Sequence, residues 1–457
     1  MSRVAGALRP EELRAALQSV LDFATRAGAT AADAVLVQQS AFSAGVRLGE
    51  VEKLTDAREK RLGLRVFVGE RSALAATADL TRGGLARCAD DTVALARVTQ
   101  PDPAHGLPDR SALATEAPDL DLYDDAAVAL SPEDALARAR TAEGAALAVD
   151  PRLSNSEGAE FSQSGAMIAY ASTLGFDGGY RSSSFDLAVQ PVAVADGHMQ
   201  RDYWYARARH LARLDDPAEV GRRAAARTIR RLGARRVPTQ EAPIVFEAEV
   251  AASLLRHLAG AVVGQSLYRG TSFLLGRQGD VVASPLVTVV DDGRMPGGHG
   301  SRPFDAEGLA TRRTVVLENG KLLSYLFDTY SARRMNAAST GNAARAVGDS
   351  PSAAPTNFYL AAGTTAPEDI IASVDRGLLV TELIGFGVNA VTGDYSRGAA
   401  GMWIEHGEIT HPVEEITIAG NLLDMFRDIE MVGSDLVFRG SVAAPTLKIR
   451  RMTIAGG

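Results

Sequence analysis

The chain reads EVAASLLRHLAGAVVG from Glu249 to Gly264. Four apolar side chains in this stretch recur every four residues, namely Val250, Leu254, Leu258 and Val262. That spacing is typical of a helix with one buried face. The apolar run at 243–246, just before it, is typical of a buried strand. The stretch therefore predicts a strand that leads directly into an amphipathic helix.

Longer motifs follow this helix toward the end of the chain. They are TGN at 340–342, VTGDYS at 391–396, TIAGNLLDMF at 417–426, GSD at 433–435, APTLKI at 444–449 and MTIAG at 452–456. With the helix, these motifs resemble those of the TldD/PmbA family, and more narrowly its PmbA (TldE) branch. The resemblance spans nearly the whole chain and is densest in the C-terminal half.

The resemblance implies two kinds of subunit. The TldD kind carries His-Glu-x-x-x-His on this helix and a cysteine near its C-terminus, which together bind zinc with the glutamate as general base. Imidazole and thiolate suit zinc, and an open coordination position activates water. Here the matching positions hold Arg256, His257 and Ala261, and the single cysteine is Cys88. Because neither a guanidinium nor a methyl group can ligate a cation, we predict no catalytic residue and no metal ligand in this chain.

Two of these residues have ordinary alternatives. A lone imidazole does not make a zinc site, so His257 is expected to be a surface or partly buried histidine rather than a surviving ligand or base. Arg256 is able to bind a substrate carboxylate through two hydrogen bonds, although a solvated surface arginine is the commoner outcome.

One other segment contains two histidines near a glutamate. Residues 406–411 read HGEITH, and His406 and His411 are the best residual zinc candidates. The flanking sequence favours a hairpin with Gly407 at its turn, and no third ligand lies nearby in the sequence. His257 and His299 do not complete a convincing ligand set either.

Composition excludes several classes of protein. The net charge is −8 with acidic and basic residues interspersed, which argues against nucleic-acid binding. An arginine-rich segment at 222–236 fits a helix over 217–233 whose arginines face solvent. One cysteine suits a reducing compartment, and no apolar run approaches the ~20 residues that cross a bilayer. We therefore predict a cytoplasmic protein with no membrane contact.

The fold class predicted is α+β. Region 1–105 reads as a helix at 10–27, short strands at 34–38, 45–48, 51–54, 62–68 and 72–76, and a helix at 85–98, which together form helices on an antiparallel sheet. After a proline-rich loop, region 106–238 has a helix that begins at Ser131-Pro132 and strands at 152–210, packed with the first region. Region 239–457 is β-rich and barrel-like, with a type I′ hairpin predicted at Asn319-Gly320.

The resemblance implies a non-catalytic subunit of a heteromeric zinc metalloprotease. A TldD-like partner would supply the zinc, so no cofactor is expected in this chain. The pair would form a chamber that trims peptide precursors or degrades unfolded peptides, with this chain as chamber wall and peptide-binding surface. A homodimer could form when the partner is missing. Two alternatives stay open: a self-sufficient peptidase with an unrecognised site, and a regulatory protein-binding factor in keeping with the family's label as a gyrase modulator.

Overall fold

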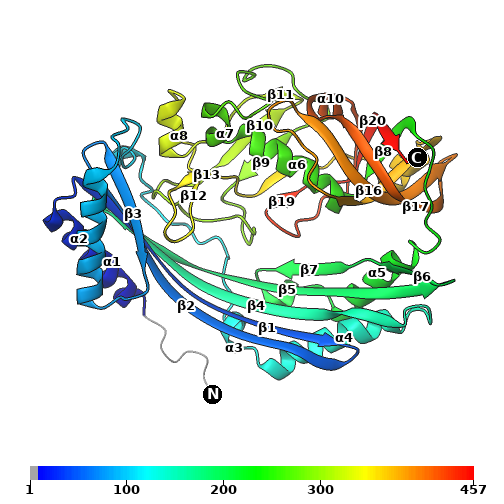
Figure 1. Ribbon diagram of the computed structural model, residues 1–457, viewed down its shortest axis with the longest axis horizontal. Helices are drawn as coiled ribbons and strands as arrows, with labels where there is room; N and C mark the ends of the chain where they lie inside the picture. Colours follow the sequence, from blue (N-terminus) through cyan, green and yellow to red (C-terminus); the bar gives the residue numbers. More distant parts are fainter. Residues whose placement is uncertain (1–8, 457) are drawn as a thin grey trace.

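The computed structural model describes residues 9–456. The two halves of the chain form two layers that lie over one another along the long axis of the molecule (Figure 1). A long curved sheet with helices forms the first layer, and a compact β-rich domain forms the second. This α+β architecture is the fold class that the sequence predicts.

The first layer is built on one seven-stranded antiparallel sheet. Its order is β3-β2-β1-β4-β5-β6, and β7 also pairs with β5. The strands are β1 (Ala31–Arg47), β2 (Glu50–Val68), β3 (Arg71–Thr77), β4 (Asn155–Ser172), β5 (Asp177–Ala195), β6 (His198–Arg201) and β7 (Trp204–Ala208). Because β1 pairs with β4, residues before and after the proline-rich loop belong to the same sheet.

The strands of this sheet are longer than the sequence predicts. The predicted short strands at 34–38 and 45–48 are parts of β1, and those at 51–54 and 62–68 are parts of β2. The part of β2 between the two predicted strands, residues 55–61, is polar and mostly exposed, so it carries no apolar alternation for a sequence pattern to detect. It nevertheless pairs with β1 as far as Arg47 and Glu50, so backbone hydrogen bonds rather than burial extend the strand.

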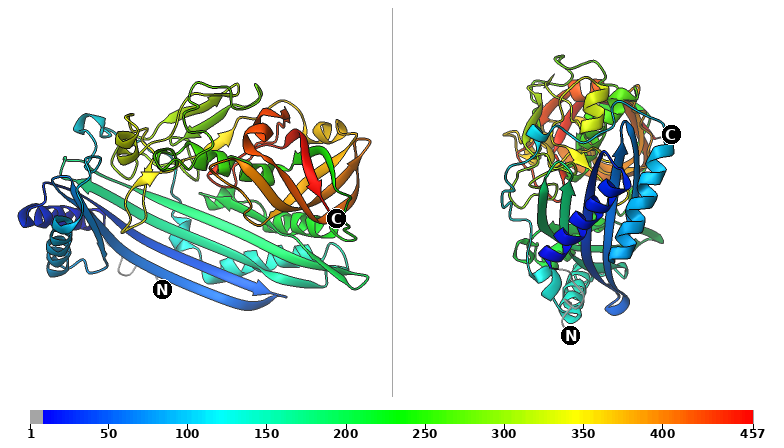
Figure 2. Two further views of the ribbon diagram at one scale, coloured as in Figure 1. Left: turned by 45° about the horizontal axis from the view of Figure 1, so that its top comes forward. Right: turned by 90° about the vertical axis from the view of Figure 1, so that its left-hand side faces the viewer.

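Four helices cover one face of the sheet. They are α1 (Pro10–Ala27), α2 (Arg82–Val98), α4 (Pro132–Leu147) and α5 (Pro217–Ile229). Helices α1 and α2 pack over Ala34 and Leu36 at one end, and α4 and α5 pack over Phe42 and Ala44 at the other. Alternate residues of a strand share a face, so both apolar cores lie on the same side. The end-on view in Figure 2 shows α1 and α2 lying across the end of the sheet.

The predicted bounds of α1 and the predicted start of α4 are confirmed, whereas α2 begins three residues before its predicted start and α5 ends at Ile229 instead of residue 233. Helix α1 begins at Pro10 and is followed by Gly28, whose φ of 103° is the left-handed conformation that glycine adopts without strain. Helix α4 is capped by Ser131, whose Oγ accepts a hydrogen bond from the Asp134 N–H at 3.1 Å. Among residues 9–456, none of the helices has both the length and the apolar composition needed to cross a bilayer.

The second layer contains a closed five-stranded barrel, which confirms the predicted barrel-like domain. Its strands are β8 (Gln240–Phe246), β15 (Arg376–Ile384), β16 (Asp394–Glu405), β17 (Glu408–Asn421) and β20 (Leu447–Ala455). Strand β17 pairs back onto β20 and closes the ring. Helix α6 (Ala248–Val262) follows β8 as predicted, and its four-residue apolar stripe is buried in the largest core of the molecule.

A smaller sheet and several short elements complete this layer. The sheet has the order β11-β10-β9-β14-β19, and β12 pairs with β13 while β18 pairs with β20. These strands are β9 (Val289–Asp292), β10 (Arg313–Glu318), β11 (Lys321–Leu322), β12 (Ala343–Ala344), β13 (Ser352–Ala353), β14 (Phe358–Leu360), β18 (Ile429–Val432) and β19 (Val442–Ala443). The predicted type I′ hairpin joins β10 to β11, since Asn319 and Gly320 have φ of 48° and 81°.

The remaining helices of the chain are short. They are α3 (Ala126–Ala129), α7 (Gly264–Tyr268), α8 (Thr329–Arg334), α9 (Pro367–Ala372) and α10 (Leu422–Arg427), with 3-10 turns at Arg110–Ala112 and Leu211–Arg213. Helix α3 and the turn at Arg110–Ala112 interrupt the proline-rich segment that the sequence predicts as loop. The other elements fill the connections of the second layer and the link from β7 to α5.

The two layers are joined at one end by a buried cluster of charges, which we call the junction cluster. It consists of Asp33, Arg65, Glu307 and Arg345. Asp33 of β1 accepts from Arg65 at 2.5 Å and from Arg345 at 2.8 Å, and Arg65 also contacts Glu307 at 3.3 Å. Burial alone would raise the pKa of Asp33, but Arg345 and Arg65 hold it below its ordinary value.

Arginines in α5 and just after its end join the layers near the other end. Arg227 is buried and contacts Glu247 at 2.7 Å, and Arg231 contacts Glu382 of β15 at 2.5 Å. The prediction that these arginines simply solvate an exposed helix face is therefore wrong for both residues. Their acidic partners lie in the second layer, 20 residues along the chain for Arg227 and 151 for Arg231, so the helical pattern could not have indicated them.

Candidate functional site

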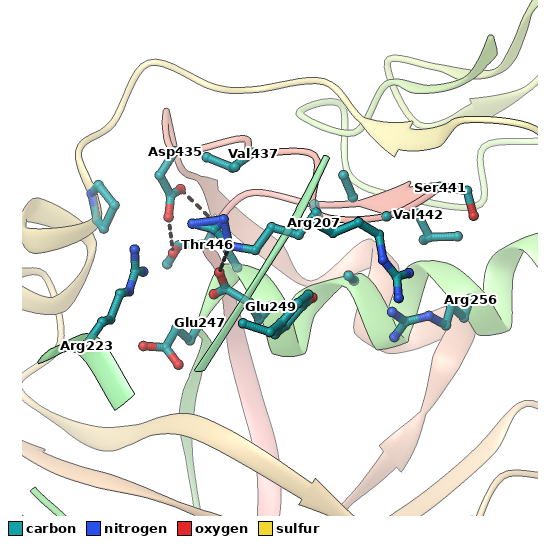
Figure 3. A pocket seen from close by; sticks show the side chains of 18 of the residues that line it. Arg207, Arg223, Glu247, Glu249, Arg256, Asp435, Val437, Ser441, Val442 and Thr446 are labelled. Atoms are coloured by element: carbon teal, nitrogen blue, oxygen red, sulfur yellow. Dashed lines mark hydrogen bonds and ion pairs between the residues drawn. The ribbon is translucent and has the colours of Figure 1, made fainter. Parts of the chain in front are cut away.

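A cleft of about 810 Å³ lies between the two layers, and we call it the main cleft. Its walls come from β7, Arg223 in the middle of α5, the stretch of α6 from Ala248 to Arg256 and the segment 435–446 (Figure 3). An adjoining space of about 420 Å³, the inner pocket, continues along α6 and shares Tyr203, Tyr205, Glu249 and Arg256 with the main cleft. The two spaces together form the candidate site.

Strand β7 supplies one wall, because its side chains alternate between the helical core and the cleft. Trp204 and Ala206 face the helical core, so Tyr205 and Arg207 point to the opposite side, into the cleft. Within residues 9–456, β7 pairs with β5 alone, and β19 on the facing wall pairs with β14 alone. Two strand edges therefore border the same cleft with backbone groups that no neighbouring strand occupies.

Helix α6 supplies the floor, because its two faces have different roles. The apolar stripe is buried in the core, while Glu249, Ala252 and Arg256 recur at three- and four-residue spacing along the main cleft. Ser253 and His257, one residue further round, line the inner pocket. The periodicity that predicts the helix thus also selects which residues face the cleft.

The carboxylates of the main cleft already have partners. Glu249 contacts Arg439 at 3.4 Å and Glu247 contacts Arg227 at 2.7 Å. Asp435 accepts hydrogen bonds from the N–H and the hydroxyl of Thr446 at 2.9 and 2.7 Å. These groups hold the walls together, so they are less available to a ligand.

Two arginines mark the ends of the main cleft. Arg223 stacks on Trp204, with its guanidinium carbon 3.7 Å from the ring centroid. Arg256 is exposed at the other end, and it has no ion-pair partner among residues 9–456 (Figure 3). Burial lowers the pKa of Arg223, which remains far above neutrality, so both ends of the cleft carry positive charge.

The three positions that the resemblance matches to the zinc motif do not fit a zinc ion. Ala261 is 3% exposed and packs in the core, pointing away from the cleft. His257 lies in the inner pocket, where burial and then Arg397 and Arg256 lower its pKa. Two guanidiniums beside one imidazole repel a divalent cation instead of binding it. Cys88 lies in α2, at the far end of the first layer.

The residual candidates lie elsewhere. His406 occupies the predicted turn between β16 and β17 with φ of 52°, and its Nδ1 is 2.8 Å from Asp375 Oδ1. His411 lies on β17 opposite Trp403, with its Nδ1 2.9 Å from Thr410 Oγ1. Neither lines the main cleft or the inner pocket. Within the described part of the chain, no three or more His, Cys, Asp or Glu side chains form a group able to hold a metal.

His299 belongs to a separate space between the layers. It lies beside Arg209 in a pocket of about 250 Å³. Burial and the charges of Arg209 and Arg207 lower the pKa of His299 to about 4. The imidazole is therefore neutral at physiological pH.

Several cleft residues were not singled out from the sequence. They are Tyr203, Tyr205, Arg397 and Arg439. The alternation of small or apolar residues with Tyr205 and Arg207 at 203–208 is a usable signal for a strand with one functional face. Nothing local to Arg397 or Arg439 indicates that β16 and the 435–446 segment reach the same helix.

Models of three domains of one protein family match the sequence. Residues 32–96 match PmbA/TldA metallopeptidase domain 1, residues 127–232 the central domain and residues 239–456 the C-terminal domain. The protein named Metalloprotease PmbA from Escherichia coli O157:H7 is 38% identical over 425 residues, which cover 93% of this chain and 92% of that protein. A homologue from Haemophilus influenzae is 36% identical and covers 98% of this chain and 96% of its own.

Solved structures share the architecture. A proposed modulator of DNA gyrase from Bacteroides thetaiotaomicron superposes with a TM-score of 0.92 at 27% identity, covering 99% of this chain and all of the other. TldE from Thermococcus kodakarensis superposes with a TM-score of 0.86, covering 96% of this chain and 100% of the other. At 22% identity, the second likeness concerns the fold alone.

Proposed function

Because this chain belongs to the PmbA/TldD metallopeptidase family, we propose that it is the PmbA-type subunit of a heteromeric zinc peptidase. In this proposal the chain itself does not hydrolyse peptides. A TldD-like partner provides the zinc ligands and the general base, and the complex acts in the cytoplasm on unfolded peptides or peptide precursors.

The observation that carries the proposal is the chemistry of the three zinc-motif positions on α6. Arg256, His257 and Ala261 stand where the catalytic branch places its ligands and base. One is a cation, one is a neutral imidazole beside two cations, and one is a buried methyl group. Water activation by zinc needs several neutral or anionic donors converging on one point, which these three positions do not offer.

The main cleft supports a role in holding extended peptide. It is bordered by the unpaired edges of β7 and β19, and an extended chain can add to such an edge through backbone hydrogen bonds that are independent of side-chain identity. Tyr203 and Tyr205 add aromatic surface to the same wall. A folded protein has no free extended backbone to offer, so the cleft favours unfolded segments.

The decisive experiment measures zinc content and peptide hydrolysis for this chain alone, for a TldD-like subunit from the same organism alone, and for the mixture. We expect no bound zinc and no hydrolysis by this chain, and hydrolysis by the mixture at a stoichiometry that size-exclusion chromatography with light scattering reports. This chain alone is expected to be a monomer or homodimer. Stoichiometric zinc, or hydrolysis by this chain alone that a chelator abolishes, would show that it is self-sufficient.

A further inference from the structure

The inner pocket contains polar atoms that lack hydrogen-bond partners. Asp202 Oδ2 and Arg227 Nε, which also line this pocket, form no hydrogen bond but lie 3.4 Å from each other as an ion pair. Ser253 Oγ and His257 Nε2 on α6 and Arg397 Nε on β16 are all buried, and none of the three has a partner within residues 9–456. All three residues line the same space of about 420 Å³. Since buried polar groups are rarely left without partners, their convergence indicates a place where a ligand completes the hydrogen bonds.

The charges of the inner pocket do not balance. Each of its three carboxylates has an arginine partner, in the pairs Asp202–Arg227 at 3.4 Å, Glu249–Arg439 at 3.4 Å and Glu382–Arg231 at 2.5 Å. Arg256 and Arg397 also line the pocket, and neither has an ion pair in the part of the chain that the structure describes. The pocket therefore presents two positive charges that the protein does not neutralise.

His257 lies close to both of these charges. Burial and the charges of Arg397 and Arg256 lower its pKa, so the imidazole is neutral at pH 7. A neutral imidazole can donate one hydrogen bond without adding a third positive charge. The pocket thus offers two guanidiniums, a hydroxyl and an imidazole N–H, which is a donor set for an oxygen anion.

We propose that the inner pocket is a carboxylate-binding site in which Arg256 and Arg397 neutralise the anion and Ser253 and His257 complete its hydrogen bonds. The carboxylate belongs to a peptide lying in the adjoining main cleft, either at its C-terminus or on an Asp or Glu side chain. This inference rests on the proposed peptide-holding role. It adds that the position a catalytic subunit gives to a metal cation is used here to anchor an anion.

Binding of labelled peptides to the isolated chain tests the proposal. Three fluorescein-labelled decapeptides of one neutral sequence serve as probes in fluorescence anisotropy: a free C-terminal acid, the C-terminal amide, and the amide with one internal Glu. We expect at least one of the two carboxylate probes to bind roughly tenfold more tightly than the plain amide, the advantage of a charge-assisted contact. The probe that gains identifies which carboxylate the pocket takes.

Arginine substitutions test whether the inner pocket causes the tighter binding of the carboxylate probe. R256Q and R397Q are each expected to remove most of the advantage of the carboxylate probe, measured as the ratio of its affinity to that of the plain amide for the same variant. R87Q makes the same change of charge on α2, where Arg87 is 76% exposed, and is expected to keep the full advantage. R397K retains the charge where R397Q folds poorly, and should retain part of the advantage because lysine lacks the second donor.

A second readout follows the His257 ring by NMR, with H257Q to assign its resonance. The bound carboxylate offsets the two guanidiniums, so the pKa of His257 should rise when the carboxylate probe binds and not with the amide. Equal affinities for all three probes, or an advantage that survives both R256Q and R397Q, would overturn the carboxylate site. The subunit proposal stands or falls separately, because zinc content and hydrolysis on mixing do not depend on these affinities.

Discussion

Two of the places where the layers meet, the junction cluster and the inner pocket, differ in how their charges are paired. In the junction cluster, two carboxylates and two guanidiniums are buried together and neutralise one another. In the inner pocket, each carboxylate forms an ion pair with another arginine, and Arg256 and Arg397 have no ion-pair partner among residues 9–456. The buried charges of the junction cluster, which we call the closed set, neutralise one another and hold the layers together. Arg256 and Arg397, which we call the open set, have no such partners and are left for a ligand.

The largest effect should follow from breaking the closed set. D33N removes the carboxylate that accepts from both Arg65 and Arg345, and leaves two buried guanidiniums without it. We expect the free energy of unfolding to fall by about 3–5 kcal/mol, measured by urea denaturation. D56N, at an exposed strand position, is the matched control and should change it by less than about 0.5 kcal/mol. Equal effects of the two variants would contradict a structural role for the junction cluster.

A smaller effect is expected from restoring a zinc-motif side chain on the buried face of α6. A261H places an imidazole where Ala261 is 3% exposed, so it should overpack the core and cost about 2–3 kcal/mol without bringing zinc. R256H introduces the same side chain on the exposed face of the same helix and should cost less than about 0.5 kcal/mol. Thermal unfolding and metal analysis of the two variants check this, and stoichiometric zinc in A261H would contradict it.

The free energy of unfolding should fall at acidic pH because of His299. Its folded pKa of about 4 is below the ordinary value of 6.5, so the unfolded chain binds the proton more readily between these values. The contribution to stability is complete above pH 6.5 and is lost as the pH falls toward 4, by on the order of 2 kcal/mol. Urea denaturation across this range gives the free energy of unfolding against pH for the wild type and for H299Q. In H299Q the decrease in this free energy between pH 6.5 and pH 4 should be smaller by that amount. Parallel curves would show that His299 does not titrate in this way.

The smallest effect on stability should come from the open set. R256Q removes an exposed charge that has no ion pair to break, so the free energy of unfolding should change by less than about 0.5 kcal/mol. A loss above about 2 kcal/mol would mean that Arg256 supports the fold, and that the two sets of charges do not differ as described.

Local sequence patterns predicted what depends on local structure. The bounds of α1, the cap of α4, the type I′ turn at Asn319-Gly320 and the buried face of α6 all depend on residues a few positions apart. The positions on α6 that match the zinc motif could likewise be located from the sequence, because they lie close together on one helix.

What the sequence did not predict depends on distant partners. The full length of β2 is set by its pairing with β1, and the burial of Arg227 is set by Glu247 in the other layer. The inner pocket brings His257 together with Arg397 from β16, and no periodicity links residues so far apart. Long-range pairing, not local propensity, decides these features.

The closed barrel has a consequence for how the protein is made on the ribosome. Strand β8 has two neighbours, β15 and β20, and both are synthesised long after it. Until residues 376–384 emerge, β8 and the helix that follows it have no ladder to join, and the ring stays open until residues 447–455 are available. Ring closure thus carries a large loop-closure entropy and places the formation of the second layer late in synthesis. The first layer completes its sheet with β7, before β8 is even translated, and can offer a finished surface on which the later half assembles.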